Sequence, residues 1–432
     1  MKNYKYTLIL FILFIGFGMT VSAQEQDSRH RTAETIIADG LAQLPAQDSN
    51  TYNQIMSEFA NTGQKGIEML AGMLKPADKN KNAAFEYAIN GMVNYATTPG
   101  KENLLGPIRQ GLITSLDKCT DKANQAFLMS QLQKCATANE ASVFEKYLSD
   151  SYLQDYAVRG LAATPGIDNE IVNLMKAEKA PKSSLAYLAY FKKLKGVEPI
   201  LLGWLNGADE KTQTAVYNAL TVCGSTAAVK TLQKAAQSKN FGLENTGATD
   251  SYLQLLNNLN DTKTTLSAAK QLLKSDKQSI RCAGLRLLLK SDSKNAGKNI
   301  LTALKDPNIQ YRNTALFFAK NFAGNGIFDQ VAAKFNSLSN EAKTDVVAWL
   351  GNNHVTNKIG IVTSAMKSDN EDLVKAAITS AGQIGGNEAL SALIGMLDGK
   401  YAPQANSALI AFNGSINDGV VQALSSSSVA TQ

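Results

Sequence analysis

The clearest structural signal in the chain lies in residues 370–397, NEDLVKAAITSAGQIGGNEALSALIGML. Leu390, Leu393, Ile394 and Leu397 follow the i, i+3, i+4, i+7 spacing that places side chains on one face of a helix and fits no strand. The residues before them show the same kind of spacing, and a glycine pair separates the two segments. The stretch therefore predicts two helices joined by a tight turn.

The first of these helices is expected over residues 371–384. Glu371 and Asp372 place negative charge on its first turn, which suits the positive end of the helix dipole. Gly385 and Gly386 follow its last turn, where a left-handed residue is needed and glycine adopts that conformation best. The helix therefore has a start signal and a stop signal.

Similar pairs of predicted helices recur about every 30 residues along the chain. Asp306 is expected to cap one of them, with Pro307 at the first helical position, because the N–H that proline lacks would be unpaired there. Unit starts are expected near residues 48, 79, 121, 150, 180, 209, 245, 276, 307, 340, 371 and 402. Such units stack in one line, and each buries its apolar face on its neighbours. The sequence therefore predicts an all-α solenoid of about twelve antiparallel helix pairs.

Three of these units resemble HEAT repeats, most closely the short HEAT-like type of the bilin lyases. The chain as a whole resembles an exported bacterial member of this repeat family. The resemblance is carried by DPNIQYRNTA at 306–315, IRCA at 280–283, LVKAA at 373–377 and GQIG at 382–385. It implies that Asp306, Arg281 and Arg312 are stacking residues between repeats, whereas Lys375 takes the arginine position in its own unit. It also implies that first helices line the convex side and second helices the concave, partner-binding side. Bilin attachment is not implied, because nothing in the sequence would hold a chromophore.

The first 23 residues have the features of a signal peptide. Lys2 and Lys5 precede an almost unbroken apolar run from Thr7 to Met19, and small residues lead to the expected cleavage site between Ala23 and Gln24. The run is too short for a comfortable transmembrane span of roughly 20 residues, and an uncleaved membrane anchor is the competing interpretation. We therefore expect an exported protein, periplasmic or extracellular, without membrane insertion after cleavage.

The predicted organisation has four segments. They are a signal peptide over residues 1–23, an N-terminal segment with a first helix over 24–45, the HEAT-like solenoid over 46–424 and a Ser-rich end over 425–432. Val420, Val421 and Leu424 form an apolar stripe that no later helix covers, whereas a solenoid normally closes with a polar capping unit. The Ser-rich end is then either the start of a truncated repeat in a fragment of a longer array or a frayed tail.

The charge balance argues against a nucleic-acid partner. The formal net charge is +6, and loss of the two lysines of the signal peptide lowers it to +4, a small excess for a chain of this length. The densest basic cluster, Lys192, Lys193 and Lys195, lies at one predicted helix end, where cations offset the helix dipole. We therefore expect no nucleic-acid binding.

The four cysteines are expected to be free, buried thiols. Cys119 and Cys135 flank one predicted helix, so about 24 Å would separate them, whereas bridged Cα atoms lie within about 7 Å. Cys223 and Cys282 lie in different predicted repeats. There is no Cys-x-x-Cys motif in the sequence, so neither a zinc site nor a redox pair is indicated.

No catalytic motif stands out in the sequence. The two histidines are His30, just after the expected cleavage site, and His354, in a predicted turn; neither has a zinc or triad motif around it. Two aromatic clusters could stack on sugar rings if exposed, but their helical spacing predicts core packing; they are Tyr187, Tyr190 and Phe191, and Phe317, Phe318 and Phe322. The sequence therefore predicts no catalytic, cofactor-binding or metal-binding residue.

One long connection, from Ser238 to Ala248, is richer in Gly and Asn than the others. Long loops on a rigid scaffold often carry function, although most are insertions that cost a solenoid little. The candidate binding residues of this loop are Asn240, Phe241, Leu243 and Glu244.

Stacked helix pairs offer a long surface for binding. The first hypothesis is an exported, non-catalytic scaffold that binds another protein along its concave face, with a glycan as a further partner class. The alternative is the N-terminal repeat region of a larger secreted sugar-processing enzyme, similar to a 3-keto-disaccharide hydrolase, whose catalytic domain is absent from this chain. The uncovered apolar stripe near residue 424 motivates the alternative.

Overall fold

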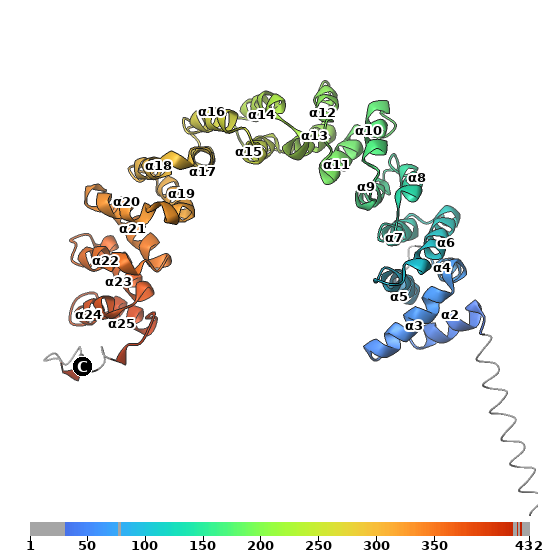
Figure 1. Ribbon diagram of the computed structural model, residues 1–432, viewed down its shortest axis with the longest axis horizontal. Coiled ribbons are helices and arrows are strands. Elements are labelled where there is room, and N and C mark those ends of the chain that lie inside the picture. Colours follow the sequence, from blue (N-terminus) through green and yellow to red (C-terminus); the bar gives the residue numbers. More distant parts are fainter. Residues whose placement is uncertain (1–30, 77–78, 418–420, 422–423, 426–432) are drawn as a thin grey trace, which may run out of the picture. The chain divides into compact units, whose positions relative to one another are not determined.

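The structure is a computed structural model that describes residues 31–76, 79–417, 421 and 424–425. Every regular element in these residues is a helix (Figure 1). The predicted signal peptide with its Ala23–Gln24 cleavage site, Val420 and the Ser-rich end from residue 426 lie outside the described residues. The signal peptide, its cleavage site and the Ser-rich end stay predictions.

The described residues divide into two compact units, unit 1 with those up to 235 and 243–251 and unit 2 with 236–242 and those from 252 onward. The helices of unit 1 are α2 (Ala33–Ala42), α3 (Ser49–Asn61), α4 (Gly63–Gly72), α5 (Lys79–Ala96), η2 (Glu102–Leu104), α6 (Leu105–Lys118), α7 (Lys122–Leu132), η3 (Ala138–Glu140), α8 (Ala141–Glu145), α9 (Gln154–Ala163), α10 (Asp168–Ala177), α11 (Lys182–Lys192), α12 (Glu198–Trp204) and α13 (Glu210–Cys223). Two helices cross the division, α14 (Thr226–Ser238) and α15 (Ala248–Asn258).

Unit 2 continues the same alternation of helices. Its elements are α16 (Thr262–Leu272), α17 (Gln278–Ser291), η4 (Ser293–Asn295), α18 (Ala296–Ala303), α19 (Ile309–Ala319), η5 (Lys320–Asn325), α20 (Ile327–Lys334), η6 (Phe335–Ser337), α21 (Asn340–Asn352), η7 (Thr356–Lys358), α22 (Ile359–Ala365), α23 (Glu371–Ile384), α24 (Asn387–Ile394) and α25 (Ala402–Ile410). Helices begin close to the predicted unit starts, as at Ser49 for position 48 and Glu371 for position 371. The predicted all-α solenoid of stacked helix pairs is therefore confirmed.

The helix pair at 370–397 forms as predicted, with α23 and α24 separated by Gly385 and Gly386. Asn370 caps α23, because its side chain accepts a hydrogen bond from Leu373 N at 2.9 Å. Both glycines have positive φ, 75° and 85°, but their ψ angles of −166° and 164° place them in a glycine-only extended region rather than the left-handed helical one. Glycine is therefore required here, for a different conformation from the one predicted.

The predicted role of Asp306 as a helix cap is wrong. Asn308 caps α19, because its side chain accepts from Gln310 N at 2.9 Å and from Tyr311 N at 3.1 Å. Asp306 instead accepts from Asn308 N at 2.9 Å and pairs with an arginine of the preceding repeat. Pro307 consequently lies in the turn and not at the first helical position.

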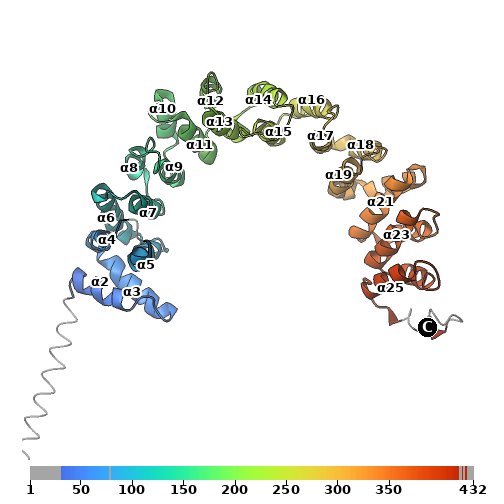
Figure 2. The same ribbon diagram turned by 180° about the vertical axis from the view of Figure 1, so that it is seen from behind.

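Unit 2 consists of two layers of helices. The first-helix layer contains α17, α19, α21, α23 and α25, and the second-helix layer contains α16, α18, α20, α22 and α24. Within this unit the row of helices bends, and both views place the first-helix layer on the inner side of the bend (Figures 1 and 2). The HEAT resemblance implied the opposite assignment, with first helices on the convex side, so that expectation is corrected.

Small residues between the first helices give a physical reason for the direction of this bend. A Cβ atom on Gly351 of α21 would lie 2.6 Å from Ser380 Oγ of α23, and one on Gly382 of α23 would lie 2.8 Å from the carbonyl oxygen of Ala408 on α25. The missing side chains of these two glycines let neighbouring first helices approach closely, and in this part of unit 2 they contact each other more extensively than neighbouring second helices do. Closer approach in one layer bends the stack toward that layer.

Arginine–aspartate pairs connect successive repeats, as the resemblance implied. Arg281 of α17 pairs with Asp306 of the next repeat, and Arg312 Nε of α19 donates to Asp345 Oδ2 of α21 at 2.6 Å. Arg312 also donates to the carbonyl oxygens of Asp306 and Pro307, at 3.0 and 2.8 Å. In the α23 repeat the series ends, because Lys375 pairs with Glu371 of its own helix.

All four cysteines are free, as predicted, although only Cys135 and Cys223 are buried, while Cys119 and Cys282 are partly exposed. Burial raises the pKa of Cys135 and of Cys223 to about 11, so almost no thiolate forms there near neutral pH.

We expect iodoacetamide at pH 7.5 to label only Cys119 and Cys282 in the native protein, and all four thiols after denaturation. Mass spectrometry of proteolytic peptides measures the labelled fraction at each position. Labelling of Cys135 or Cys223 in the native state at the rate of Cys282 would contradict the buried positions of these two thiols.

Candidate functional site

The loop that the sequence marked as a candidate site has several structural roles. Asn240 and Phe241 have positive φ angles of 49° and 47°, and Phe241 N donates to Ala236 O at 2.8 Å, which ends α14. The ring of Phe241 is half-buried and lies 6.3 Å from the ring of the buried Tyr252. Both residues are therefore held by local contacts in unit 2.

The other two loop residues belong to unit 1. The carboxylate of Glu244 accepts from Thr246 N at 2.7 Å and from Ala248 N at 2.5 Å, so it caps the start of α15. Leu243 is 97% exposed and is the one loop residue of the four that is free of a structural contact of this kind. The binding role of Leu243 stays a prediction.

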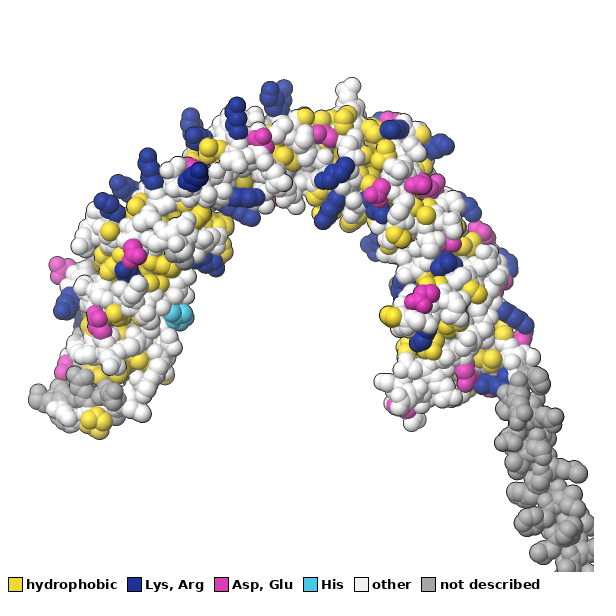
Figure 3. All heavy atoms as spheres, viewed as in Figure 1, with side chains coloured by type: hydrophobic (Ala, Val, Ile, Leu, Met, Phe, Trp, Pro, Cys, Tyr) yellow, Lys and Arg dark blue, Asp and Glu magenta, His cyan; other side chains and the backbone are white. Residues whose placement is uncertain are grey.

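A surface without charged side chains lies on the inner side of unit 2, along four successive first helices. Their C-terminal parts have no charged side chain from Asn313 to Ala319 in α19, from Val346 to Asn352 in α21, from Ala376 to Ile384 in α23 and throughout α25. We name this surface the neutral strip and define it by Asn313, Phe317, Ala348, Asn352, Thr379, Gln383, Gln404 and Ser407. In Figure 3 the inner edge of unit 2 from α21 to α25 is correspondingly white, apart from a histidine.

An aromatic hollow of about 420 Å³ opens in the neutral strip between α19 and α21. Phe317 is 60% exposed at its edge, with Phe318 against it edge-on at 5.0 Å and Lys320 Nζ 5.0 Å from its ring centroid. Trp349 contributes to the wall, is buried, and stacks on Phe328 of the second-helix layer at 4.6 Å. Packing behind the wall therefore fixes the aromatic part of the hollow.

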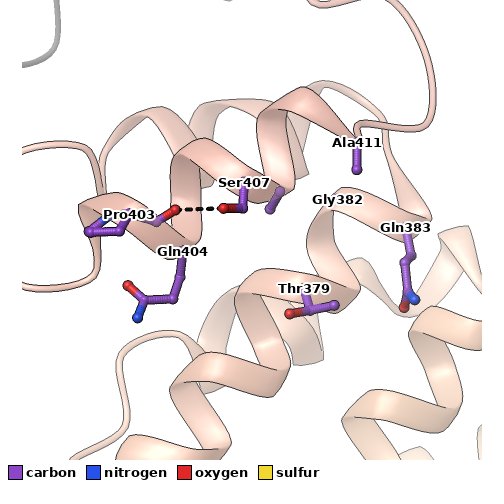
Figure 4. Close-up of a pocket in the computed structure, with 8 residues that line it drawn as sticks. Thr379, Gly382, Gln383, Pro403, Gln404, Ser407 and Ala411 are labelled. Atoms are coloured by element: carbon purple, nitrogen blue, oxygen red, sulfur yellow. Dashed lines mark hydrogen bonds between the residues drawn. The ribbon is translucent and has the colours of Figure 1, made fainter.

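An amide hollow of about 410 Å³ follows between α23 and α25 (Figure 4). Thr379 and Gln383 come from α23, whereas Gln404 and Ser407 come from α25, and no charged residue lines the hollow. The buried Oε1 of Gln404 has no hydrogen-bond partner among the described residues. Ser407 Oγ donates to the carbonyl oxygen of Pro403 at 2.9 Å, so its lone pairs are still available as an acceptor.

Hydrogen bonds at Gln383 connect the two hollows. Gln383 Nε2 donates to Asn352 Oδ1 at 3.2 Å across the gap between α23 and α21. The carbonyl oxygen of Gln383 accepts from Asn413 Nδ2 at 3.1 Å and lies 2.6 Å from Nδ1 of His354. Gln383 is thereby held in one place at the centre of the neutral strip, where its side chain also borders the amide hollow.

An apolar hollow of about 310 Å³ adjoins the strip at its other end. It is lined by Leu253, Asn257, Cys282, Ala283, Arg286, Leu287, Thr314 and Phe318. Phe318 borders this hollow while its neighbour Phe317 borders the aromatic hollow, so one aromatic pair separates the two.

The structure corrects the expectation of core packing for the aromatic clusters. Phe191 and Phe317 are 53% and 60% exposed. Phe317 lies four residues after Asn313, on the stripe of α19 that faces away from the buried Ala315 and Ala319. The sequence does contain a signal for this surface, because the C-terminal parts of four successive first helices have no charged residue. That signal indicates a shared surface only when these helices are known to lie next to each other.

The described part of the chain has no group of three or more His, Cys, Asp and Glu side chains that could hold a metal ion. None of the helices within the described ranges is both long enough and apolar enough to cross a membrane.

No protein-family model and no curated protein matches this chain. Among solved structures it is similar to the karyopherin Kap121p bound to the extreme C-terminus of the protein phosphatase Cdc14p, with 13% identity over 90% of this chain and 49% of that chain, at a TM-score of 0.41. Kap121p bound to Nup53p gives 11% identity, 89% and 53% coverage and a TM-score of 0.42, and an engineered protein gives 18% identity, 92% and 96% coverage and a TM-score of 0.23. The chain spans about half the length of the karyopherin chains, and at these scores the likeness assigns no family.

Proposed function

We propose that this chain is an exported, non-catalytic repeat scaffold that binds an extended segment of another protein along the neutral strip. The observation that carries the proposal is the run of hollows on one face of α19, α21, α23 and α25. These helices pack sideways on their neighbours and backward on the second-helix layer, so the strip is the face left for a partner. Export rests on the sequence of residues 1–23.

Amide side chains suit the main chain of a polypeptide, because each offers donors and an acceptor in one plane. The protein already makes such a contact internally: Asn82 Oδ1 accepts from Lys75 N and Asn82 Nδ2 donates to Lys75 O, both at 2.7 Å. The exposed Asn313 of the neutral strip could bind a partner's peptide unit in the same way.

The amide hollow favours an uncharged partner segment, because no charged residue lines it. A charged side chain placed there would lose hydration without gaining an opposite charge, which is unfavourable. The aromatic hollow is also bordered by Lys320 and by Asp345, whose carboxylate is already paired with Arg312. The aromatic ring of Phe317 and the apolar hollow instead provide contact for one or two apolar side chains. The expected ligand is therefore an extended, uncharged stretch of polypeptide with an apolar anchor.

Selection of a random 12-residue peptide library on the mature chain tests this proposal. We expect enrichment of uncharged sequences with an apolar residue, and for a selected peptide Phe317→Ala should weaken binding about tenfold or more, as for an aromatic anchor at an interface. Gln383→Ala should weaken binding as well. Isothermal titration calorimetry measures each Kd, with Tyr152→Ala as the control because Tyr152 is a similarly exposed aromatic in unit 1.

Two outcomes would overturn the proposal. The first is an equal loss of binding in Phe317→Ala and Tyr152→Ala, which would show that the peptide does not bind at the neutral strip. The second is failure of any peptide to bind while a neutral oligosaccharide binds with the same dependence on Phe317, which would replace the peptide by a glycan.

The alternative, a repeat region of a larger secreted sugar-processing enzyme, is supported by apolar exposure after the last described repeats. Ile410 of α25 is 80% exposed, Val421 is 67% exposed and Leu424 is 62% exposed, so these side chains could pack on a further element. Reading the coding DNA beyond Gln432 tests this alternative. An in-frame continuation into Trp- and Gly-rich strand patterns would favour it, whereas a stop codon followed by an unrelated gene would remove it.

A further inference from the structure

Positive charge is concentrated in residues 261–306. This segment has ten basic and four acidic residues, a net charge of +6, although the chain without its predicted signal peptide has only +4. The basic residues are Lys263, Lys270, Lys274, Lys277, Arg281, Arg286, Lys290, Lys294, Lys298 and Lys305; the acidic residues are Asp261, Asp276, Asp292 and Asp306. Such asymmetry along a chain indicates an anionic partner.

The structure gathers six of these lysines on the outer side of unit 2. We name them the lysine patch: Lys263, Lys270 and Lys274 on and after α16, and Lys294, Lys298 and Lys305 on η4, on α18 and after it. All six are exposed, and Lys263 and Lys270, seven residues apart, lie on one stripe of α16. The two helices follow one another along the outer layer in both views, and Figure 3 shows basic side chains along this outer edge.

The lysine patch keeps an excess of positive charge. None of its six lysines forms an ion pair with a described residue. Of the nearby acids, Asp306 pairs with Arg281, whereas Asp261, Asp276 and Asp292 are not in ion pairs with described residues. The pKa of Asp261 is lowered mainly by hydrogen bonds from Thr264 and also by the charge of Lys263, so this carboxylate offsets part of the patch. Three carboxylates therefore stand near six lysines.

The composition of the lysine patch indicates which anion it fits. Its cations are all lysines, which act as flexible point charges, and the arginines of the segment lie in the first-helix layer. The exposed residues between the lysines are uncharged and not aromatic, such as Ser267 and Thr302, so the patch has no platform for stacking nucleobases. Its position on the outer side of a bend suits contact with a flat surface at two neighbouring helices.

We propose that the lysine patch binds the phosphate headgroups of an anionic phospholipid bilayer and so holds the scaffold at a membrane surface without insertion. Each lysine near such a surface strengthens binding by about fivefold, and the effect decays within a Debye length of about 10 Å at 0.1 M salt. The proposal is independent of the peptide site, because the patch is on the second-helix layer and the neutral strip on the first-helix layer.

Vesicle cosedimentation of the mature chain tests the proposal. The vesicles contain either 30% phosphatidylglycerol in phosphatidylcholine or phosphatidylcholine alone, at 50 and 300 mM salt. We expect binding only to the anionic vesicles, with a steep loss at high salt. The triple variant K263Q/K270Q/K298Q should lower the partition coefficient roughly 100-fold, from about fivefold for each lysine removed.

The control variant K176Q/K211Q/K230Q removes the same charge from three exposed lysines of unit 1 that form no ion pair with described residues. It should retain binding within about threefold, since its lysines lie outside the lysine patch. Equal loss in both variants would overturn the proposal in favour of non-specific attraction by net charge. No binding to anionic vesicles, or binding of polyglutamate or duplex DNA in preference to them, would also overturn it.

Discussion

Replacing Asp345 with alanine should lower the free energy of unfolding of unit 2 by about 3–5 kcal/mol, because it leaves a buried guanidinium without its counter-charge. Arg312 is 4% exposed and Asp345 is 9% exposed, and the pair connects α19 to α21 at 2.6 Å. Burial raises the pKa of Asp345 despite the neighbouring arginine, so ionising this carboxyl inside the fold has a cost in free energy. The hydrogen bond and the opposite charge of Arg312 offset that cost, so removing either partner leaves the other as an unpaired buried charge.

Urea unfolding followed by the fluorescence of Trp349 measures this change. The chain has two tryptophans, so a Trp204→Phe background leaves a probe in α21 alone. The control is the double variant Arg312→Met/Asp345→Leu, which replaces both charges by apolar side chains and should cost less than the single variant. A loss below about 1 kcal/mol in Asp345→Ala would show that this pair does not hold the two repeats together.

Replacing Gly385 with alanine should destabilise the last repeats by about 3–5 kcal/mol, from backbone strain and a main-chain collision together. The residue has φ 75° and ψ −166°, a conformation that is essentially confined to glycine. An added Cβ would lie 2.0 Å from the carbonyl oxygen of Asn413. Moving Asn413 away would break its N–H bond to Gly382 O, of 2.9 Å, which joins the turn after α25 to α23.

Gly386→Ala is the matched control for this prediction. Its φ of 85° imposes similar strain, but no atom lies within 4 Å of the added Cβ, so only about 1–3 kcal/mol is expected. Hydrogen exchange of α23 and α25 measures the stability of the last repeats directly. Equal destabilisation by the two substitutions would contradict the close approach of Asn413 to Gly385.

Spacing of apolar residues was sufficient to predict the helix pairs. Leu390, Leu393 and Ile394 face the core as their spacing required, and Arg281 and Arg312 connect repeats as the HEAT resemblance implied. Both features depend on residues close together in the sequence, or on one contact between neighbouring repeats. Local pattern determines such features, so the sequence is informative about them.

Features that depend on how neighbouring helices approach could not be predicted in this way. Asp306 is a good cap by its residue type, yet Asn308 takes that role because Arg281 of the preceding repeat holds Asp306. The inner position of the first helices depends on Gly351 and Gly382, whose importance is visible only against the side chains that they face.

The neutral strip and the lysine patch were missed for a related reason. Phe317 and Gln383 are far apart in sequence, as are Lys263 and Lys298, and each pair shares a surface only because alternate helices stack. The net charge of the whole chain does not reveal that residues 261–306 carry a net charge of +6, because the rest of the chain contains nearly equal numbers of acidic and basic residues.

Hydrogen–deuterium exchange of the chain without residues 1–23, with and without a peptide selected from the library, tests the central claim of peptide binding most directly. We predict slower exchange in α19, α21, α23 and α25 on addition of the peptide, and unchanged exchange in α16 and α18. Slower exchange confined to the second-helix layer or to unit 1, with no change in these four helices, would contradict binding along the neutral strip.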